Sequence, residues 1–172
     1  MKQTIKIKML NGKVAKPCIK EDSDWIDLRT AEDIRIEGPY TKQARKDTNR
    51  KTVFSTKVVP LGIAMQLPKG YEAIVNVRSS TYKNFNVVLA NSQGVIDETY
   101  NGDNDQWFVH LIAFKDTRIS LGDRICQFRI QLSQKATVWQ KIKWLFSNGV
   151  RIKFVDNLND IDRGGHGHSG IK

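Results

Sequence analysis

The chain has 172 residues, of which 40% are hydrophobic, so it is long enough to form one domain with its own core. Its two cysteines, Cys18 and Cys126, are too few for a disulfide framework, and no apolar run reaches the roughly 18 residues of a membrane span. The N-terminus alternates charged and apolar residues, unlike a signal peptide, so we expect a cytoplasmic protein. The net charge of +10 fits an anionic partner or a solvated surface, and by itself it identifies no ligand.

Strand patterns dominate the chain. Residues 4–9 alternate apolar and polar side chains, and residues 52–59 are rich in β-branched residues. Residues 108–114 form a mostly apolar run that is typical of a buried strand. Turn-forming pairs such as Asn11-Gly12 and Asn101-Gly102 recur between such segments. Further strands are predicted over residues 34–36, 63–67, 71–77 and 124–132. Many short strands with regular turns favour an all-β barrel or jelly roll.

The segment near the C-terminus breaks this pattern. Residues 138–146 place apolar side chains at spacings of one, three and four, which predicts a short amphipathic helix. Asn148-Gly149 gives a helix stop, and residues 150–155 predict one more strand. The tail from Asp156 onward is polar and rich in glycine, so we expect it to be mobile when no ligand is bound.

Residues 94–102, Gly-Val-Ile-Asp-Glu-Thr-Tyr-Asn-Gly, place an acid and an aromatic residue three positions apart between two glycines. A turn between two strands exposes main-chain groups that can read the edge of a base. An ionised Asp97 carboxylate can polarise a water molecule, and the Tyr100 ring can form a rigid floor. Alone, the stretch also fits an ordinary hairpin with a turn-forming aspartate and a core tyrosine.

Four other stretches carry polar groups suited to a nucleotide. Arg78-Ser79-Ser80 follows a predicted strand, and hydroxyls beside a permanent positive charge suit phosphate oxygens. The others are residues 24–28, 122–127 and 163–170. In this order, together with residues 94–102, they resemble the trimeric dUTP nucleotidohydrolases (dUTPases), and the phage-encoded branch in particular.

The resemblance implies specific roles around the hairpin. Asp97 would orient the attacking water as general base, and Tyr100 would pack under the deoxyribose and exclude a 2′-hydroxyl. Main-chain groups of the hairpin would recognise uracil. The residues assigned to substrate binding here are Asn91, Gly94, Val95 and Ile96.

The resemblance also assigns a phosphate-binding set. Ser79, Ser80 and the Gln127 amide would contact the phosphate chain, and Arg78 would support the site through nearby acids. Asp27 would lie in the second shell of a Mg²⁺ ion, reached through water, or hold other site residues in place. The first motif departs from the family, because Asp24 and Trp25 replace the usual Ala-Gly. Cys126 is expected to be a buried packing residue.

In the tail, Arg163 would address the γ-phosphate. The family's uracil-stacking phenylalanine is missing, and His166 takes its place, since an imidazole can stack on a base and donate to phosphate. Gly167, His168 and Ser169 complete the predicted substrate-binding arm, whose glycines let the backbone approach a polyphosphate. An alternative is that His166 and His168 form a transition-metal pair.

At the level of the fold, the resemblance implies a jelly-roll homotrimer with sites at subunit interfaces and with Mg²⁺ as cofactor. We expect a barrel core over residues 1–132, a branch-specific insert over 133–160 and a glycine-rich arm over 161–172. Similar inserts mark staphylococcal phage enzymes that relieve pathogenicity-island repressors. The insert therefore predicts a repressor-binding surface around an exposed Trp139 or Trp144, unless both rings pack on the barrel.

Three alternatives remain. A dCTP deaminase on the same fold would need an acid in the strand after the hairpin, and residues 107–114 contain none. A regulatory protein-binding module with weak or no catalysis would work through the insert alone. A nucleic-acid-binding barrel would use the basic clusters, but no interleaved aromatic set accompanies them. We therefore expect hydrolysis of dUTP to dUMP and pyrophosphate.

Overall fold

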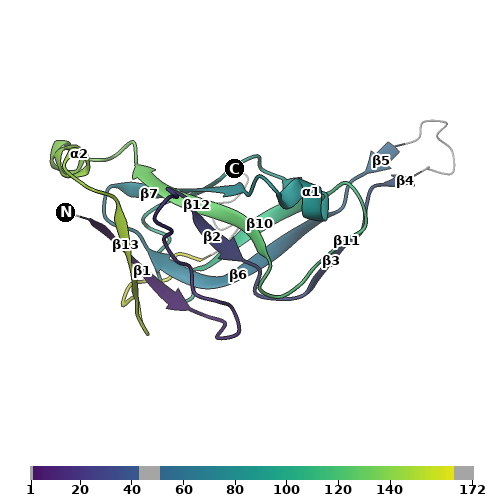
Figure 1. Cartoon of the computed structure of the whole chain (residues 1–172), viewed down its shortest axis with the longest axis horizontal. Helices are drawn as coiled ribbons and strands as arrows, with labels where there is room; N and C mark the ends of the chain where they lie inside the picture. Colours follow the sequence, from purple (N-terminus) through teal and green to yellow (C-terminus); the bar gives the residue numbers. More distant parts are fainter. Residues whose placement is uncertain (1, 43–50, 165–172) are drawn as a thin grey trace.

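The computed structural model describes residues 2–42 and 51–164, and most of its regular structure is β-strand (Figure 1). A five-stranded sheet has the order β13-β1-β6-β10-β8, and a four-stranded sheet has the order β2-β12-β7-β9. Two smaller ladders join β11 with β3 and β4 with β5. The strands are β1 (Gln3–Met9), β2 (Ile26–Arg29), β3 (Ile34–Ile36), β4 (Tyr40–Lys42), β5 (Lys51–Val53), β6 (Thr56–Gln66), β7 (Tyr71–Val77), β8 (Val87–Leu89), β9 (Gly94–Ile96), β10 (Gln106–Ala113), β11 (Thr117–Ile119), β12 (Arg124–Leu132) and β13 (Val150–Phe154).

The inward side chains of both main sheets form one core. Trp107 of β10 packs edge-to-face on Phe128 of β12, with ring centroids 5.3 Å apart, and both rings are fully buried. This contact joins the two sheets, and the predicted all-β class is confirmed. Two details of the prediction were wrong. The predicted strand over 52–59 is interrupted after Val53, and β10 alternates buried and half-buried residues instead of being buried throughout.

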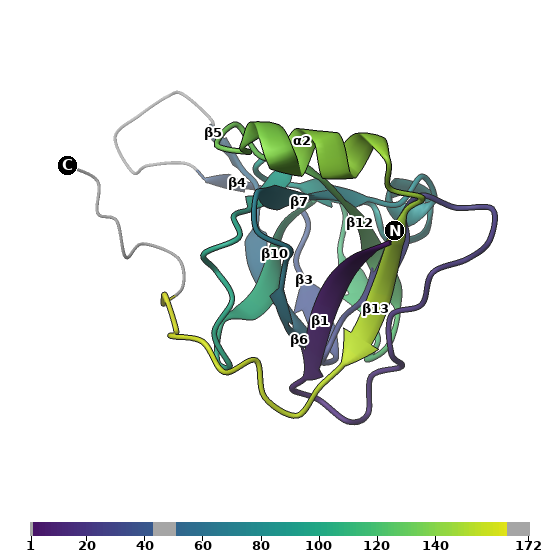
Figure 2. The same cartoon turned by 90° about the vertical axis from the view of Figure 1, so that its left-hand side faces the viewer.

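Two helices lie outside the sheets. The short α1 (Thr81–Phe85) was not predicted, whereas α2 (Val138–Leu145) forms where the apolar spacing indicated. Thr137 and Gln140 build a capping box that satisfies the first turn of α2. Figure 2 shows α2 lying across one end of the barrel. Trp144 packs on Tyr71, with ring centroids 5.4 Å apart, whereas Trp139 is 74% exposed.

The segment after α2 returns to the barrel. β13 pairs in parallel with β1 over Gln3–Ile7, so the two strands lie side by side in Figure 2. The chain then runs along the 101–105 loop, where Asn104 donates to the Asp162 carboxylate. Hydrogen bonds also join Leu158, Arg163 and Gly164 to this loop, and the predicted mobility of the tail stays a prediction. In the part of the chain that the structure describes, no helix has the length and apolarity to cross a membrane.

Candidate active site

The predicted site residues lie at two ends of one strand, β7. In the four-stranded sheet, Ala73 is opposite Ile96, so Asp97 follows β9 near the start of β7. Arg78 follows the other end of β7. Glu72, the neighbour of Ala73, and Arg78 are six positions apart, and a rise of about 3.3 Å per residue places the two ends of β7 roughly 20 Å apart. We call residues 94–102 with Arg163 the hairpin site, and Asp27 with Arg78 and Arg124 the arginine cluster.

The turn of the hairpin site holds Asp97 in a fixed, ionised state. The Thr99 N–H donates to Asp97 Oδ1 at 2.8 Å, and the Tyr100 N–H donates to the Asp97 carbonyl at 3.1 Å. Hydrogen bonds from Thr99, and to a smaller extent the Arg163 and Lys135 charges, hold the pKa of Asp97 below its usual value. The carboxylate is half exposed and so accessible to a ligand, as a general base must be.

The Tyr100 hydroxyl is hydrogen-bonded to the barrel. Its O–H donates to the Gln106 carbonyl at 2.7 Å, and its ring packs against the core. Burial, with the nearby Asp105 and Asp162 charges, raises the pKa of Tyr100. The phenol is therefore neutral and fixed, which is the geometry that a rigid floor for a sugar requires.

β9 offers its main chain to a ligand. Within the described ranges it is the last strand of its sheet and pairs with β7 on one side only. An edge strand has main-chain N–H and C=O groups that point away from the sheet. Gly94 packs tightly on Val75, and Val95 is exposed. Asn91 lies in the turn before β9, where its carbonyl accepts the Gln93 N–H at 2.6 Å.

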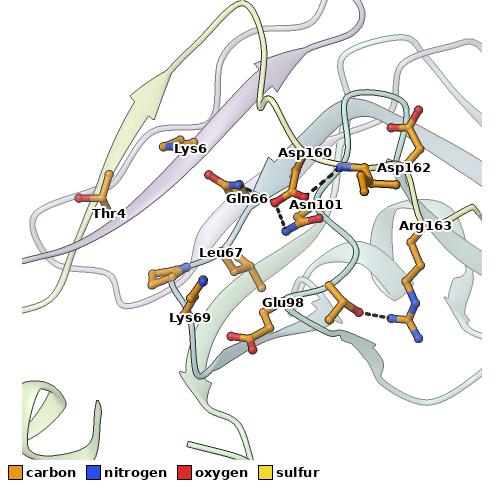
Figure 3. A pocket seen from close by; sticks show the side chains of 13 residues that line it. Thr4, Lys6, Gln66, Leu67, Lys69, Glu98, Asn101, Asp160, Asp162 and Arg163 are labelled. Carbon is orange, nitrogen blue, oxygen red and sulfur yellow. Dashed lines mark hydrogen bonds between the residues drawn. The ribbon is translucent and has the colours of Figure 1, made fainter. Parts of the chain in front are cut away.

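Arg163 reaches the hairpin of its own chain. Its Nη1 donates to Thr99 Oγ1 at 2.8 Å and lies 3.9 Å from Asp97 Oδ1. Figure 3 shows the Arg163 side chain among the residues that line the neighbouring pocket. Both Arg163 and Thr99 line a pocket of about 630 Å³ between the hairpin, β1 and the 160–163 segment. The pocket is lined by three cationic side chains, Lys6, Lys69 and Arg163, and by three acidic ones, Glu98, Asp160 and Asp162. Because the two charges balance, the pocket is not a dedicated phosphate-binding site.

Two acidic residues that the sequence analysis did not single out form hydrogen bonds that stabilise the hairpin site. The Gly70 N–H donates to the Glu98 carboxylate, which ties the hairpin to the turn before β7. Asp105 is 2% exposed, and its carboxylate accepts main-chain N–H groups of Gly102, Arg163 and Gly164. The position of Asp105, shortly after a motif glycine, gave no signal of this role in the sequence.

The arginine cluster surrounds Asp27. Arg78 Nε donates to Asp27 Oδ1 at 2.7 Å, Arg124 Nη1 donates to Oδ2 at 3.0 Å, and Lys20 lies 3.5 Å from Oδ2. Burial acts to raise the pKa of Asp27, but the Arg78 charge and the hydrogen bonds from both arginines lower it overall. Asp27 thus binds two guanidinium groups, and its role in the site stays a prediction.

The predicted phosphate-binding residues gather at the same end. Gln127 of β12 lies opposite Asp27 of β2 in the register of the sheet. Ser79 is exposed, and Ser80 Oγ accepts from Arg78 at 3.4 Å at the start of α1. Next to Gln127, Cys126 is fully buried, and burial together with the Asp27 charge raises the pKa of its thiol. Cys126 is therefore an inert packing residue, as expected.

The residues present do not form a metal cage. The described residues include no group of three or more His, Cys, Asp or Glu side chains placed to hold an ion. Both oxygens of Asp27 already face cationic side chains, so this carboxylate does not fit direct ligation. His166, Gly167, His168 and Ser169, predicted for the arm, lie outside the described residues, so their roles and the metal-pair alternative remain predictions.

The chain is similar to several known proteins over most of its length. A family model described as dUTPase matches residues 42–170. The chain is 48% identical over 168 residues to the SPbeta prophage-derived deoxyuridine 5′-triphosphate nucleotidohydrolase YosS of Bacillus subtilis (strain 168), covering 98% of this chain and 99% of that protein. It is 35% identical over 119 residues to the deoxyuridine 5′-triphosphate nucleotidohydrolase of Orientia tsutsugamushi (strain Ikeda), covering 68% and 70% of the two chains.

Solved structures share the fold. The dUTPase of Streptococcus mutans has a TM-score of 0.59 at 19% identity, covering 76% of this chain and 98% of that one. A variant of the Staphylococcus bacteriophage 80alpha dUTPase with dUpNHpp has a TM-score of 0.58 at 16% identity, covering 97% and 98%. The strand order and hairpin thus define a β-barrel of the dUTPase type. The chain belongs to the dUTPase family, which confirms the predicted family, fold class and enzyme class.

Proposed function

We propose that the protein hydrolyses dUTP to dUMP and pyrophosphate. The observation that carries this proposal is the Asp97 turn, where Thr99 keeps an accessible carboxylate ionised beside an edge strand with free main-chain groups. In this scheme Asp97 orients a water molecule toward the α-phosphorus and accepts its proton. Gly94, Val95 and Ile96 bind uracil through the main chain, and Tyr100 lies under the deoxyribose.

We further propose that each site combines two chains of a homotrimer. Arg78, Ser79, Ser80 and Gln127 would bind the phosphates, but within one chain they lie at the opposite end of β7 from Asp97. A nucleotide cannot bridge roughly 20 Å between its base and its phosphates at both ends of one strand. A symmetric assembly solves this, because the hairpin of one protomer can face the arginine cluster of the next.

We propose that Mg²⁺ binds together with the triphosphate of the substrate. The described residues provide no cage for it, so the phosphate oxygens and water would hold the ion, a common arrangement for this hard cation. When bound, it neutralises phosphate charge. The family offers one parallel, since a phage phi11 dUTPase coordinates a structural Mg(II) ion. The role of Asp27, which would contact the ion through a water molecule, stays a prediction.

The test is pyrophosphate release from dUTP, dTTP, dCTP and UTP with Mg²⁺. We expect selective turnover of dUTP, and a loss of about 10³-fold in kcat for Asp97→Asn, because an amide cannot act as general base. Circular dichroism would show that the variant folds. Turnover of dCTP with release of ammonia would favour the deaminase alternative. A folded wild-type protein with no activity on dUTP would refute the proposal and leave the binding-module alternative.

One observation favours a second role, in protein binding. α2 exposes Val138, Trp139 and Leu145 to solvent beside Lys141 and Lys143, although Trp144 packs on the barrel. Phage 80alpha dUTPases control the transfer of virulence genes by a G protein-like mechanism. We propose that the 133–160 segment with α2 binds a pathogenicity-island repressor. We propose that this segment lies between a core over residues 1–132 and an arm over residues 161–172. We also propose that the protein acts in the cytoplasm of a bacterial host.

Titration calorimetry with a purified repressor would test this second role. Trp139→Ala combined with Leu145→Ser should abolish binding and keep dUTP turnover, since both side chains are exposed. Lys51→Ala, in the distant β5, is the control and should bind normally. Equal binding by the double variant and the wild type would show that α2 is not the binding surface.

A further inference from the structure

The strongest unassigned polar side chain of the four-stranded sheet is Asn76, near the end of β7. It is half-buried, and its neighbour Val77 packs against the core. Because successive side chains of a strand point to opposite faces, the Asn76 side chain lies on the outer face of the sheet. Asparagine is uncommon inside strands, so its presence in β7 indicates a task other than packing.

Asn76 belongs to a row of polar residues that crosses three strands. Gln127 of β12 is opposite Asn76 of β7 on one side and opposite Asp27 of β2 on the other. Directly opposite residues of antiparallel strands point to the same face, with Cβ atoms about 5 Å apart. The Asn76 side chain therefore lies beside that of Gln127, and the row ends in the arginine cluster.

The arginine cluster gives this face an excess of positive charge. Arg78, two residues after Asn76, donates to Asp27 Oδ1 at 2.7 Å, and Arg124 donates to Oδ2 at 3.0 Å. Lys20 lies 3.5 Å from the same oxygen, so three cationic groups surround one carboxylate. A surface with such a charge balance attracts an anion.

The fold leaves the two neighbouring amides of the row unpaired. Within the described ranges, the side chains of Asn76 and Gln127 have no hydrogen-bond partner. Gln131 differs, because it lies on the same face of β12 and donates to the Glu72 carboxylate at 2.7 Å. An amide NH₂ group has two donors, and the oxygens of a phosphate are acceptors. The unpaired amides therefore suit a phosphate that the cluster attracts.

We propose that Asn76 is a substrate-binding residue that donates to the phosphate chain of dUTP beside Gln127. The register of β7 and β12 presents the two amides side by side, and the charge of the arginine cluster holds the phosphates in front of them. This role rests on the proposed hydrolysis of dUTP. It adds to that proposal a phosphate-binding residue that lies outside every motif of the sequence.

Steady-state kinetics of pyrophosphate release test this contact. Asn76→Ala should raise KM for dUTP about tenfold, because a hydrogen bond to a charged group is lost. The change in kcat should be smaller, since the contact forms with the bound substrate as well as in the transition state. Gln131→Ala is the matched control. It removes an amide from the same face, but one that already binds Glu72, so KM should stay at the wild-type value.

The isosteric variant Asn76→Asp separates a substrate contact from a structural role. An ionised carboxylate donates no hydrogen bond and repels phosphate, so KM should rise about 100-fold. The same carboxylate lies near Arg78 and Arg124, so the midpoint of urea unfolding without substrate should not fall. Size-exclusion chromatography should show an unchanged assembly. Wild-type KM values in both Asn76 variants, with or without a loss of stability or assembly, would overturn the proposal.

Binding of dUpNHpp, measured by titration calorimetry, separates this contact from the proposed reaction. Both Asn76 variants should bind dUpNHpp at least about tenfold more weakly than the wild type, and Gln131→Ala should bind normally. If the wild type binds dUpNHpp but does not hydrolyse dUTP, the proposed function fails and the weaker binding of the variants still supports the contact. If dUTP is hydrolysed and both variants bind with wild-type affinity, the contact is refuted and the proposed function stands.

Discussion

The polar side chains at the two ends of β7 are held in place by different kinds of interaction. At the hairpin site, main-chain N–H groups fix the carboxylates, so Asp97 is bound by its own turn and remains accessible. At the arginine cluster, Arg124 of β12 and Arg78 at the end of β7 contact the partly buried Asp27 of β2. The first end orients a reactive group, and the second end concentrates positive charge. Neither end contains what the other supplies, which supports the proposed site shared between chains.

The largest effect is expected when one lesion is placed at each end of β7. Asp97→Asn and Arg78→Ala chains, each nearly inactive alone, are refolded together as mixed trimers. Half of the hairpins and half of the clusters stay intact, so about one quarter of the sites should regain activity if two chains build each site. Pyrophosphate release measures the recovery.

Refolding each variant alone gives the baseline for this experiment. Size-exclusion chromatography with light scattering would report whether trimers form. If the mixture is no more active than the separate variants, the two ends act within one chain, and the shared-site model is wrong.

The second prediction concerns stability at the arginine cluster. Arg78→Ala should lower the free energy of unfolding by about 2 kcal/mol, because a partly buried carboxylate loses a charge-assisted hydrogen bond. The folded pKa of Asp27 is lowered, so its contribution is present above the unfolded pKa of about 4 and is lost as pH falls through the lower folded pKa. Urea titrations at neutral pH and near pH 3 would measure this.

The variant should therefore differ less from wild type at the acidic pH than at neutral pH. Arg129→Ala is the control, since its partner Asp24 is exposed and such pairs contribute little. An equal loss of stability for the two variants would contradict the special role of the Arg78–Asp27 pair.

The smallest effect is expected at the hairpin turn. Thr99→Val removes the hydroxyl that bonds Asp97 and accepts from Arg163 but keeps the main-chain N–H bond. The pKa of Asp97 should rise toward its usual value, so the acidic limb of kcat/KM should move to higher pH. At neutral pH the rate should fall less than about tenfold, because Asp97 stays ionised.

Thr99→Ser restores a hydroxyl and should restore the wild-type pH profile. The profile is read from initial rates of pyrophosphate release across the acidic range. An unchanged profile in Thr99→Val would mean that the N–H bond alone sets the ionisation of Asp97.

Local patterns in the sequence were sufficient for much of the fold. Alternating residues predicted β1, β7 and β12, and apolar spacing predicted α2, because these signals depend only on the period of the element. Motif order also singled out Asp97, Tyr100 and Gln127, and the structure places them on or beside strands of one sheet. The short α1 escaped prediction, since five residues are too few to show a helical period.

Which distant residues meet depends on the tertiary structure. The bonds from Arg78 and Arg124 to Asp27, and from Arg163 and Gly164 to Asp105, span 51 to 97 residues. No periodic signal encodes such contacts, because they arise from the way the strands pair and the chain returns to the barrel. Sequence patterns predicted most of the elements and the residue types of the candidate site, because both are local; strand pairing placed those residues at two ends of one strand.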